Sequence, residues 1–282
     1  MDRTHAEAER SAAAVARPYM FDNTSAQEYQ RLDLMSQILD PWTRGYLTAL
    51  GVAPGWNCLE LGGGNGSITA WLAERVGLSG RVVAVDIYTA LLELLPNPNV
   101  AVQELDVRSG ALPGRDYDLV TCRAMLHQIA DDAPAVLAKM AAAIRPGGWL
   151  LVQEPDFHLA ATTEPEAWAA AWQGVLAWGR QQGVDWFIGR RLPSLIDGLG
   201  LQHTQAKTDV QNIRGRDRGA LYFQLFFAEV REPLLASGLL DAKTFDAASA
   251  LLDDPTSWTQ CWMMTAVWAR KPDGASAAPP TG

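Results

Sequence analysis

The spacing of apolar positions changes twice along the chain, and the first stretch has the period of an amphipathic helix. Between Ser25 and Leu50, apolar residues such as Leu32 and Leu39 recur every three or four positions. Pro41 interrupts this run, which predicts two successive helices because an internal proline removes a backbone donor. We therefore expect residues 18–50 to form a helical cap in front of the next region.

Short apolar runs alternate with amphipathic stretches over residues 51–157. The predicted strands are Asn57 to Leu61, Arg81 to Asp86, Val100 to Glu104, Tyr117 to Cys122 and Trp149 to Gln153. Helices are predicted between them, near Ser67 to Val76, Thr89 to Leu95 and Ala133 to Ile144. Strands separated by helices of this length require right-handed crossovers, which build a parallel sheet with helices on both faces. Such a sheet binds its ligands at the carboxyl ends of its strands.

Residues 158–270 predict longer helices and two last strands. The helices are Glu164 to Gln182, Arg191 to Leu199, Arg218 to Leu235 and Ala242 to Leu252, and the strands are Leu201 to Ile213 and Thr259 to Arg270. Aromatic residues recur at helical spacing on the first and third of these helices, and such stripes usually belong to a core. The helices lie outside the predicted sheet unit, however, which favours a lid over an apolar acceptor pocket. The candidate acceptor-binding residues are Trp168, Trp172, Tyr222, Phe223 and Phe226.

Composition and charge narrow the kinds of partner. The 282 residues are 48% hydrophobic and carry a formal net charge of −9, so the overall field repels polyphosphates and anionic membranes. We expect a small-molecule acceptor, with neither nucleic acid nor a membrane as partner, and a monomer or homodimer. The three cysteines, Cys58, Cys122 and Cys261, are too far apart for a zinc site or a disulfide framework, so no metal is predicted.

The two ends of the chain have the composition of flexible tails, over residues 1–17 and 271–282. The first lacks the basic start and apolar middle of a signal peptide. Apolar runs nowhere approach the roughly 18 to 20 residues that span a bilayer. These features predict a cytoplasmic location.

A glycine-rich turn follows the first predicted strand, in the sequence Glu60-Leu61-Gly62-Gly63-Gly64-Asn65-Gly66. Such a turn lets backbone amides approach a ligand closely. Its third glycine falls one place too early for the dinucleotide fingerprint, and the lysine of a phosphate-binding loop is absent. The carboxylate of Glu60 would repel a phosphate but can hold an ammonium group. The turn therefore predicts a ligand that carries a positive charge.

Two further carboxylates complete the picture of that ligand. Asp86 ends the second strand, about 20 residues beyond the glycines, where an acidic side chain can accept hydrogen bonds from both ribose hydroxyls. Asp106 and Val107 follow the third strand, where they can bind an adenine amine and pack on its ring. Alone, Asp86 or Asp106 could be a helix cap or turn residue and Glu60 a surface carboxylate. Together they describe S-adenosylmethionine.

Four successive segments carry a family resemblance. They are Glu60 to Gly66, Val82 to Asp86, the run Leu112-Pro113 with Tyr117-Asp118-Leu119-Val120, and Ile144-Arg145-Pro146-Gly147-Gly148-Trp149-Leu150. In order and spacing they resemble the motifs of class I S-adenosylmethionine-dependent methyltransferases. The similarity is strong over residues 50–156. It extends weakly into Phe21-Asp22 and Arg31-Leu32, which resemble the cofactor-covering segment of small-molecule methyltransferases from bacterial secondary metabolism.

This resemblance implies a Rossmann-like α/β fold with a seven-stranded, mostly parallel sheet in the order 3-2-1-4-5-7-6, whose last strand is antiparallel. It implies roles for the residues already discussed: Gly62 and Gly64 would pass under the methionine part and Asp86 would bind the ribose. Ile87 would flank the adenine, and Arg123 would line the cofactor after the fourth strand. Asp106 and Val107 would hold the adenine edge. We interpret Pro146-Gly147-Gly148 as a turn between helix and strand.

Methyl transfer from a sulfonium is an in-line displacement, to which a protein contributes mainly alignment and a dry cavity. A general base is needed only where the acceptor must lose a proton before it attacks. His127 follows the fourth strand and is the candidate base, since histidine exchanges protons near neutral pH; a helix cap or a pocket wall is the alternative. Glu154 follows the fifth strand with Asp156 and His158, as a second polar cluster and a further catalytic candidate.

The leading hypothesis is methylation of an O, N or C atom of a small, largely apolar natural-product intermediate. Two alternatives remain open from the sequence. The first is an enzyme that binds S-adenosylmethionine without consuming it and promotes pericyclic or elimination chemistry. The second is a non-catalytic module that retains the fold, against which the intact Gly64 and Asp86 argue.

Overall fold

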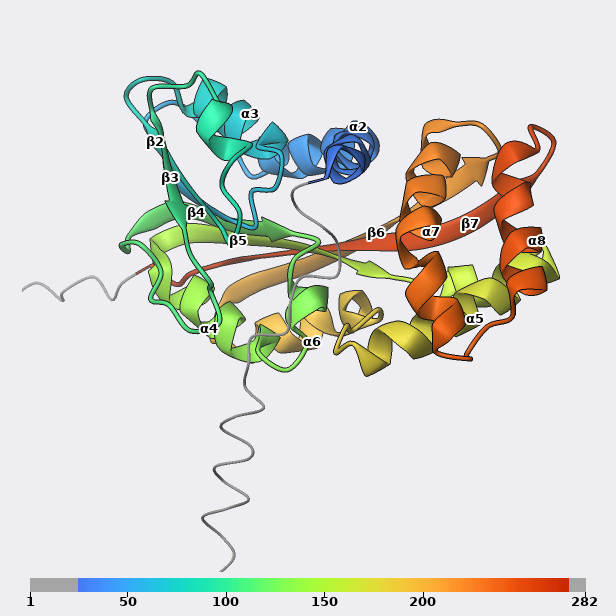
Figure 1. Ribbon diagram of the computed structural model, residues 1–282. Coiled ribbons are helices and arrows are strands. Elements are labelled where there is room, and N and C mark those ends of the chain that lie inside the picture. The colour runs from blue at the N-terminus through green and yellow to red at the C-terminus, as the bar shows by residue number, and fades with distance from the viewer. Residues whose placement is uncertain (1–24, 274–282) are drawn as a thin grey trace, which may run out of the picture.

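The protein forms one mixed sheet with helices on both faces (Figure 1). The computed structural model describes residues 25–273, so the predicted tail 1–17, the pair Phe21-Asp22 and the end of the second tail lie outside it. The strands are β1 (Asn57–Leu61), β2 (Arg81–Asp86), β3 (Val100–Glu104), β4 (Tyr117–Arg123), β5 (Ile144–Asp156), β6 (Gln202–Arg214) and β7 (Trp258–Arg270). Their order is β3-β2-β1-β4-β5-β7-β6.

The sheet has the topology that the resemblance implies. Strands β1 to β5 pair in parallel, and β7 inserts antiparallel between β5 and β6. The predicted α/β class, the seven strands and their order are therefore confirmed. Because the four N-terminal parallel strands all end at one edge, the loops after them converge there.

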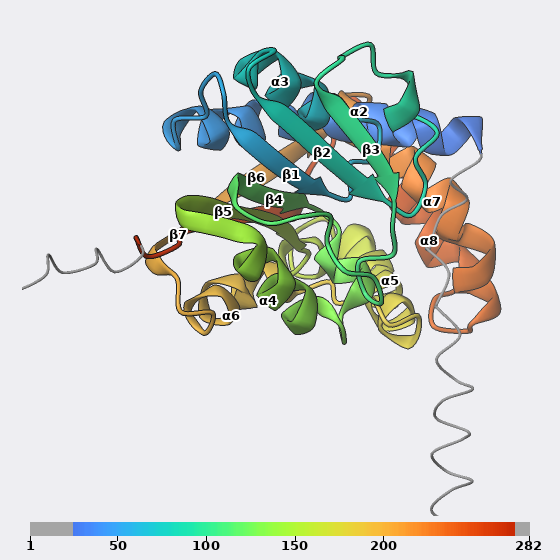
Figure 2. The same cartoon turned by 90° about the vertical axis from the view of Figure 1, so that its left-hand side faces the viewer.

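The helices are α2 (Ala26–Ala49), α3 (Ser67–Val76), α4 (Ala133–Ala143), α5 (Glu166–Gln181), α6 (Leu192–Asp197), α7 (Arg218–Ala236) and α8 (Ala242–Asp253). Short 3₁₀ turns are η1 (Leu92–Leu94), η2 (Leu126–Ile129), η3 (Leu159–Ala161) and η4 (Ile188–Arg191). Figure 2 shows α2 and α3 on one face of the sheet and α4 and α6 on the other. None of the helices within residues 25–273 has the length and apolarity needed to cross a bilayer.

Side-chain alternation along β1 feeds a separate core on each face. Cys58 packs with Leu72 of α3, whereas Leu59 and Leu61 pack with Leu137 of α4. Successive residues of a strand point to opposite faces, so Glu60 lies on the α3 side together with Cys58. That position governs what its carboxylate can reach.

A third core lies beyond the sheet, where α5, α7 and α8 pack on the extended ends of β6 and β7 (Figure 1). We call these three helices the lid. Its interior is aromatic: the ring centroids of Trp172 and Phe226 lie 5.5 Å apart in a stacked arrangement. Those of Trp168 and Phe223 lie 5.9 Å apart, edge to face. Offset and edge-to-face pairs of this kind add to the stabilisation from buried area.

The prediction of two helices before residue 50 is wrong. One continuous helix, α2, runs through Pro41. The proline removes a single backbone donor on the exposed side of the helix. Leu39 and Leu47 are buried on either side of it, and their packing keeps the two halves in one direction.

Two other local predictions differ from the structure. The expected helix Thr89 to Leu95 is only the turn η1. Pro146-Gly147-Gly148 is not a turn between elements but belongs to β5, which begins at Ile144. Its register against β4 shifts between Tyr117 and Leu119, and Gly147 has φ +73°. The segment is therefore an irregularity inside the strand, a conformation that glycine adopts readily.

Candidate active site at the carboxyl ends of the parallel strands

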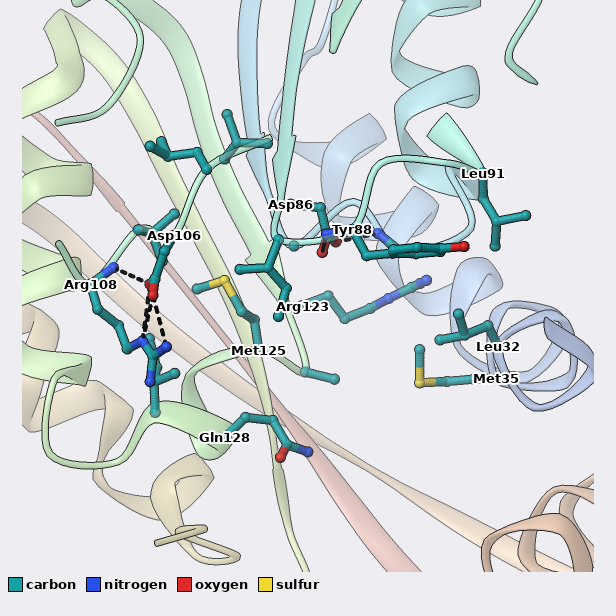
Figure 3. Close-up of a pocket in the computed structure, with 18 of the residues that line it drawn as sticks. Leu32, Met35, Asp86, Tyr88, Leu91, Asp106, Arg108, Arg123, Met125 and Gln128 are labelled. Carbon is teal, nitrogen blue, oxygen red and sulfur yellow. Dashed lines mark hydrogen bonds and ion pairs between the residues drawn. The ribbon is translucent and has the colours of Figure 1, made fainter. Parts of the chain in front are cut away.

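A cavity of about 150 Å³ opens where β1, β2, β3 and β4 end. Figure 3 shows Asp106 and Arg108 on one side of it and Leu32 and Met35 of α2 on the other. Seven of the predicted cofactor-binding residues line it: Gly62, Gly64, Asp86, Ile87, Asp106, Val107 and Arg123. The eighth, Glu60, does not line it. The further lining residues include Tyr29, Tyr88, Met125 and Gln128.

Asp86 ties the glycine turn to the end of β2. Its Oδ2 accepts from the Gly64 amide at 2.9 Å, and its Oδ1 accepts from the Tyr88 amide at 3.1 Å. An ionised carboxylate has about four acceptor positions, so about two remain for a ligand. Burial raises the pKa of Asp86, and the amides of Gly64 and Tyr88 oppose that shift. The carboxylate is thus both part of the cavity wall and available to it.

The glycine turn leaves room for a ligand. Gly62 and Gly64 have φ values of +70° and +56°, in the region that side chains other than glycine rarely adopt. A methyl group at Gly64 would meet no protein atom within 4 Å, whereas one at Gly62 would press on Met125 at 3.1 Å. Gly64 also lines the cavity.

The far end of the cavity holds a carboxylate and an apolar surface. Arg108 binds Asp106 through Nε at 2.9 and 3.1 Å and through Nη2 at 2.7 Å. The hydrogen bonds from Arg108 lower the pKa of Asp106, so this group stays ionised and accepts hydrogen bonds. Ile87 is 47% exposed even though it is a large apolar residue. An exposed isoleucine beside a carboxylate suits the face and the edge of a planar base.

Glu60 lies behind the glycine turn and is buried. Its Oε2 accepts from the Thr69 hydroxyl of α3 at 2.6 Å. Burial raises its pKa from 4.5 to about 7. Such a group favours the folded state below pH 4.5, and this contribution is lost as the pH rises through about 7. The predicted contact between Glu60 and an ammonium group stays a prediction.

Helix α2 is fastened over the cavity by a polar cluster that the sequence did not reveal. Asp40 accepts from Arg123 Nη1 at 2.9 Å and from the Ser67 hydroxyl at 3.0 Å. Ser36 donates to Asn65 of the glycine turn at 3.0 Å. Arg123, predicted to line the cofactor, therefore also binds the helix that covers it.

Glu154 and His127, the two catalytic candidates, form a pair. Glu154 is fully buried and accepts from the amides of Met125, Leu126 and His127 at 2.9, 2.7 and 3.2 Å. His127 Nδ1 lies 3.0 Å from Glu154 Oε2. Nε2 lies 2.8 Å from the Gln128 amide nitrogen, which can only donate. In this arrangement Nε2 therefore holds the lone pair, and Nδ1 carries the proton.

A second cavity, of about 40 Å³, adjoins the first. Met35, Ala124 and Gln128 line both, and we call these three residues the shared wall. Ala124 has φ +52°, an unusual conformation for alanine that often occurs at functional sites. The remaining lining residues of the second cavity are Arg31, His127, Pro155, Phe157, Trp186, Tyr222, Phe223, Phe226, Trp262 and Met264.

The structure divides the predicted acceptor-binding residues into two groups. Tyr222, Phe223 and Phe226 line the second cavity together with His127. Trp168 and Trp172 are fully buried in the lid core and line neither cavity. Their contact with an acceptor stays a prediction, and in the structure Trp172 stacks on the cavity-lining Phe226. Over residues 25–273, no cluster of three or more metal-binding side chains occurs.

Sequence reasoning missed the residues that come from distant segments. Tyr29 of α2 and Tyr88 after β2 have hydroxyl groups 3.1 Å apart beside the first cavity. Gln128 lines both cavities. Its place directly after His127 was the only signal in the sequence, whereas the tyrosine pair had none.

The sheet order, with the glycine turn after β1, is that of a class I methyltransferase fold. A family model described as a methyltransferase domain matches residues 22–206. The chain therefore belongs to the methyltransferase domain family, whose cofactor is S-adenosylmethionine. The residues present fit that cofactor, because Gly64 leaves its side open and Asp86 keeps about two acceptor positions.

Known relatives agree with this family. The ubiquinone/menaquinone biosynthesis C-methyltransferase UbiE of Hahella chejuensis is 31% identical over 144 residues, which are 48% of this chain and 57% of the relative. The match thus spans little more than half of that relative's length.

Two solved structures share the fold. One is the Haemonchus contortus phosphoethanolamine N-methyltransferase 2, solved in complex with phosphomonomethylethanolamine and S-adenosylhomocysteine. It is 16% identical with a TM-score of 0.51, over 87% of this chain and 53% of that one. The [4+2]-cyclase SpnF is 15% identical with a TM-score of 0.52, over 95% and 93%.

Proposed function

We propose that this chain transfers a methyl group from S-adenosylmethionine to an O, N or C atom of a small, largely apolar metabolite, such as a natural-product intermediate. One observation carries the proposal. A cavity with carboxylates suited to a nucleoside and a cavity lined by aromatic rings adjoin at the shared wall of Met35, Ala124 and Gln128. A group transferred between two ligands has to cross such a boundary.

The chain's own residues would contribute alignment and exclusion of water. When bound, S-adenosylmethionine supplies an electrophilic methyl group. Asp86 and the glycine turn would hold S-adenosylmethionine in position, and the aromatic rings would hold the acceptor. Holding two reactants in line in this way lowers the activation barrier by several kcal/mol. Met35 and Ala124 are apolar, so the shared wall brings few groups that could hold water near the reaction.

His127 is the proposed general base for an acceptor that must lose a proton. Its Nε2 carries the lone pair because Glu154 holds the proton on Nδ1, and His127 lines the second cavity. Glu154 then acts through His127 as a positioning residue. The amide of Gln128 would have to turn away from Nε2 before a substrate proton reaches it.

The lining of the second cavity supports a flat, apolar acceptor. Six aromatic side chains line it, three of them from α7, namely Phe157, Trp186, Tyr222, Phe223, Phe226 and Trp262. The name of the UbiE relative places it in ubiquinone and menaquinone biosynthesis, which is consistent with an apolar ring. Four of these six residues follow residue 206, where the family match ends, so the family does not determine the acceptor. The net charge of −9 disfavours nucleic acid.

The test combines binding with transfer. Isothermal titration calorimetry with S-adenosylhomocysteine should show binding at one site. Incubation with methyl-labelled S-adenosylmethionine and a panel of small aromatic acceptors should then move label into an organic-soluble product. The protein could instead bind S-adenosylhomocysteine, label no acceptor and rearrange a substrate while S-adenosylmethionine stays unconsumed. That result would replace methyl transfer by the non-methylating chemistry. Absence of cofactor binding would overturn the proposal.

A further inference from the structure

A buried polar group forms part of the wall of the second cavity. Arg31 of α2 and Tyr222 of α7 both line it. Arg31 Nη1 donates to the Tyr222 hydroxyl oxygen at 2.8 Å. Arg31 also donates from Nε and Nη2 to the two oxygens of Glu28, each at 2.6 Å. A guanidinium that forms a two-bond pair with a carboxylate is fixed in orientation.

This arrangement decides what the Tyr222 hydroxyl can do. Arg31 has only donors, so the hydroxyl oxygen is the acceptor in their bond and keeps its own hydrogen for another partner. Burial raises the pKa of Tyr222, so the phenol remains protonated. A hydroxyl that accepts from a cation is polarised, which strengthens the hydrogen bond that it donates.

A second donor without a partner lines the same cavity. Trp262 of β7 is 3% exposed, and its indole nitrogen has no acceptor among the residues that the structure describes. Its ring lies 4.8 Å from that of Tyr222, centroid to centroid. A buried N–H group without an acceptor is costly, and a ligand oxygen would remove that cost.

We infer that Tyr222, oriented by Arg31 and Glu28, is the specificity-determining anchor of the acceptor and binds a carbonyl, enol or phenol oxygen on a flat apolar ring. The inference rests on the proposed function, because it takes the second cavity to be the acceptor site. It deepens that function by naming the chemical class of the acceptor. Tyr222, Arg31 and Trp262 all line the cavity and carry a hydroxyl, a guanidinium and an indole N–H, so this part of the wall is rich in hydrogen-bond donors. A ring that carries oxygen satisfies them.

Aromatic rings around a cavity can also hold an ammonium group by cation–π attraction, which is the competing possibility. Two features of the second cavity oppose it. The guanidinium of Arg31 lies in the same wall, and a buried like charge disfavours a second cation. The carboxylate that could attract a cation, Glu28, already accepts two bonds from Arg31 and does not line the cavity.

The test is direct binding of three naphthalene probes: 2-naphthol, 2-naphthylmethylamine, whose ammonium group is charged at neutral pH, and naphthalene itself. Titrations by calorimetry use the full chain with S-adenosylhomocysteine present, so no reaction takes place. We expect 2-naphthol to bind about tenfold more tightly than naphthalene, as one polarised hydrogen bond would give. We also expect it to bind more tightly than 2-naphthylmethylamine. If 2-naphthol binds no better than either, the inference is overturned without any variant.

Tyr222→Phe should weaken 2-naphthol binding by about tenfold and leave naphthalene binding unchanged. Tyr46→Phe is the matched control, since the hydroxyl of Tyr46 in α2 donates to Asp209 and Tyr46 lines neither cavity. Arg31→Lys keeps the positive charge but cannot form the two-bond pair with Glu28. It should weaken 2-naphthol binding less than Tyr222→Phe does. Equal weakening of both probes by Tyr222→Phe would indicate a collapsed cavity and would contradict the anchor.

The two proposals fail separately in this design. If 2-naphthol binds as expected while the protein neither binds S-adenosylhomocysteine nor transfers a methyl group, the anchor stands and the proposed function falls. If the cofactor binds and label is transferred, but only to amines and with no effect of Tyr222→Phe, the proposed function stands and the anchor falls.

Discussion

Substituting Asp86 by asparagine is the sharpest probe of the cofactor site. Asp86 accepts from the amides of Gly64 and Tyr88 at 2.9 and 3.1 Å, and about two acceptor positions remain for ribose hydroxyls. An asparagine side chain at this position would have one oxygen, and its NH₂ group would face a donor. Losing two charge-assisted bonds of about 1.5 kcal/mol each removes about 3 kcal/mol, or about 100-fold in affinity.

Calorimetry with S-adenosylhomocysteine measures this loss directly. Asp118→Asn is the matched control, because Asp118 also accepts from a backbone amide, that of Asn57 at 2.7 Å, but lies outside the cavity. Both variants should lose comparable stability, and only Asp86→Asn should lose affinity. Affinity of a folded Asp86→Asn protein within about threefold of the wild type would show that the ribose does not bind at Asp86.

Three further predictions follow from the same geometry. The pKa of Glu60 is raised from 4.5 to about 7, so the wild type should lose stability relative to Glu60→Gln as the pH rises through that range. The unfolding free energies of the two proteins should diverge by about 3 kcal/mol in favour of Glu60→Gln. Urea denaturation that shows the same pH dependence for both proteins would contradict this. Gly64→Ala should cost about 1 kcal/mol of stability and weaken S-adenosylhomocysteine binding, whereas Gly77→Ala, with φ +63° and equally open, should cost only stability. His127→Gln should lower kcat for a hydroxyl acceptor roughly 100-fold or more with unchanged cofactor affinity; an unchanged kcat would exclude it as the base.

The parallel part of the sheet was predictable because each strand is a short apolar run between clear turns. The prediction of β2 over Arg81 to Asp86 agrees with the structure at both ends. Its final residue then falls at the carboxyl edge by topology alone. The loops after the strands therefore converge on one cavity, as the four motifs implied.

Side-chain direction was harder to predict than position. Glu60 lies on the α3 side of β1 and binds Thr69, while its contact with an ammonium group stays a prediction. Strand alternation contains this information, since Cys58 and Glu60 have to point to the same face. The prediction of a helix break at Pro41 was wrong for another reason. A local propensity was outweighed by tertiary packing of α2, which only the folded structure reveals.

The acceptor side depends on pairs that no local pattern encodes. Arg31 and Tyr222 are separated by 191 positions, and Trp262 joins them from the last strand. The aromatic spacing on α5 and α7 agrees with the helices observed there, but it could not distinguish the residues that line the cavity from those that support them. Trp172 and Phe226 stack on each other, yet only Phe226 reaches the cavity.

The central claim is that the cavity at the ends of β1 to β4 binds a sulfonium nucleoside next to the aromatic cavity. A crystal structure of the protein grown with S-adenosylhomocysteine tests it most directly. The account predicts ribose density at Asp86, adenine between Ile87 and Asp106, and the sulfur beside the shared wall of Met35, Ala124 and Gln128. Density for a dinucleotide there, or a nucleoside bound elsewhere on the chain, would contradict it.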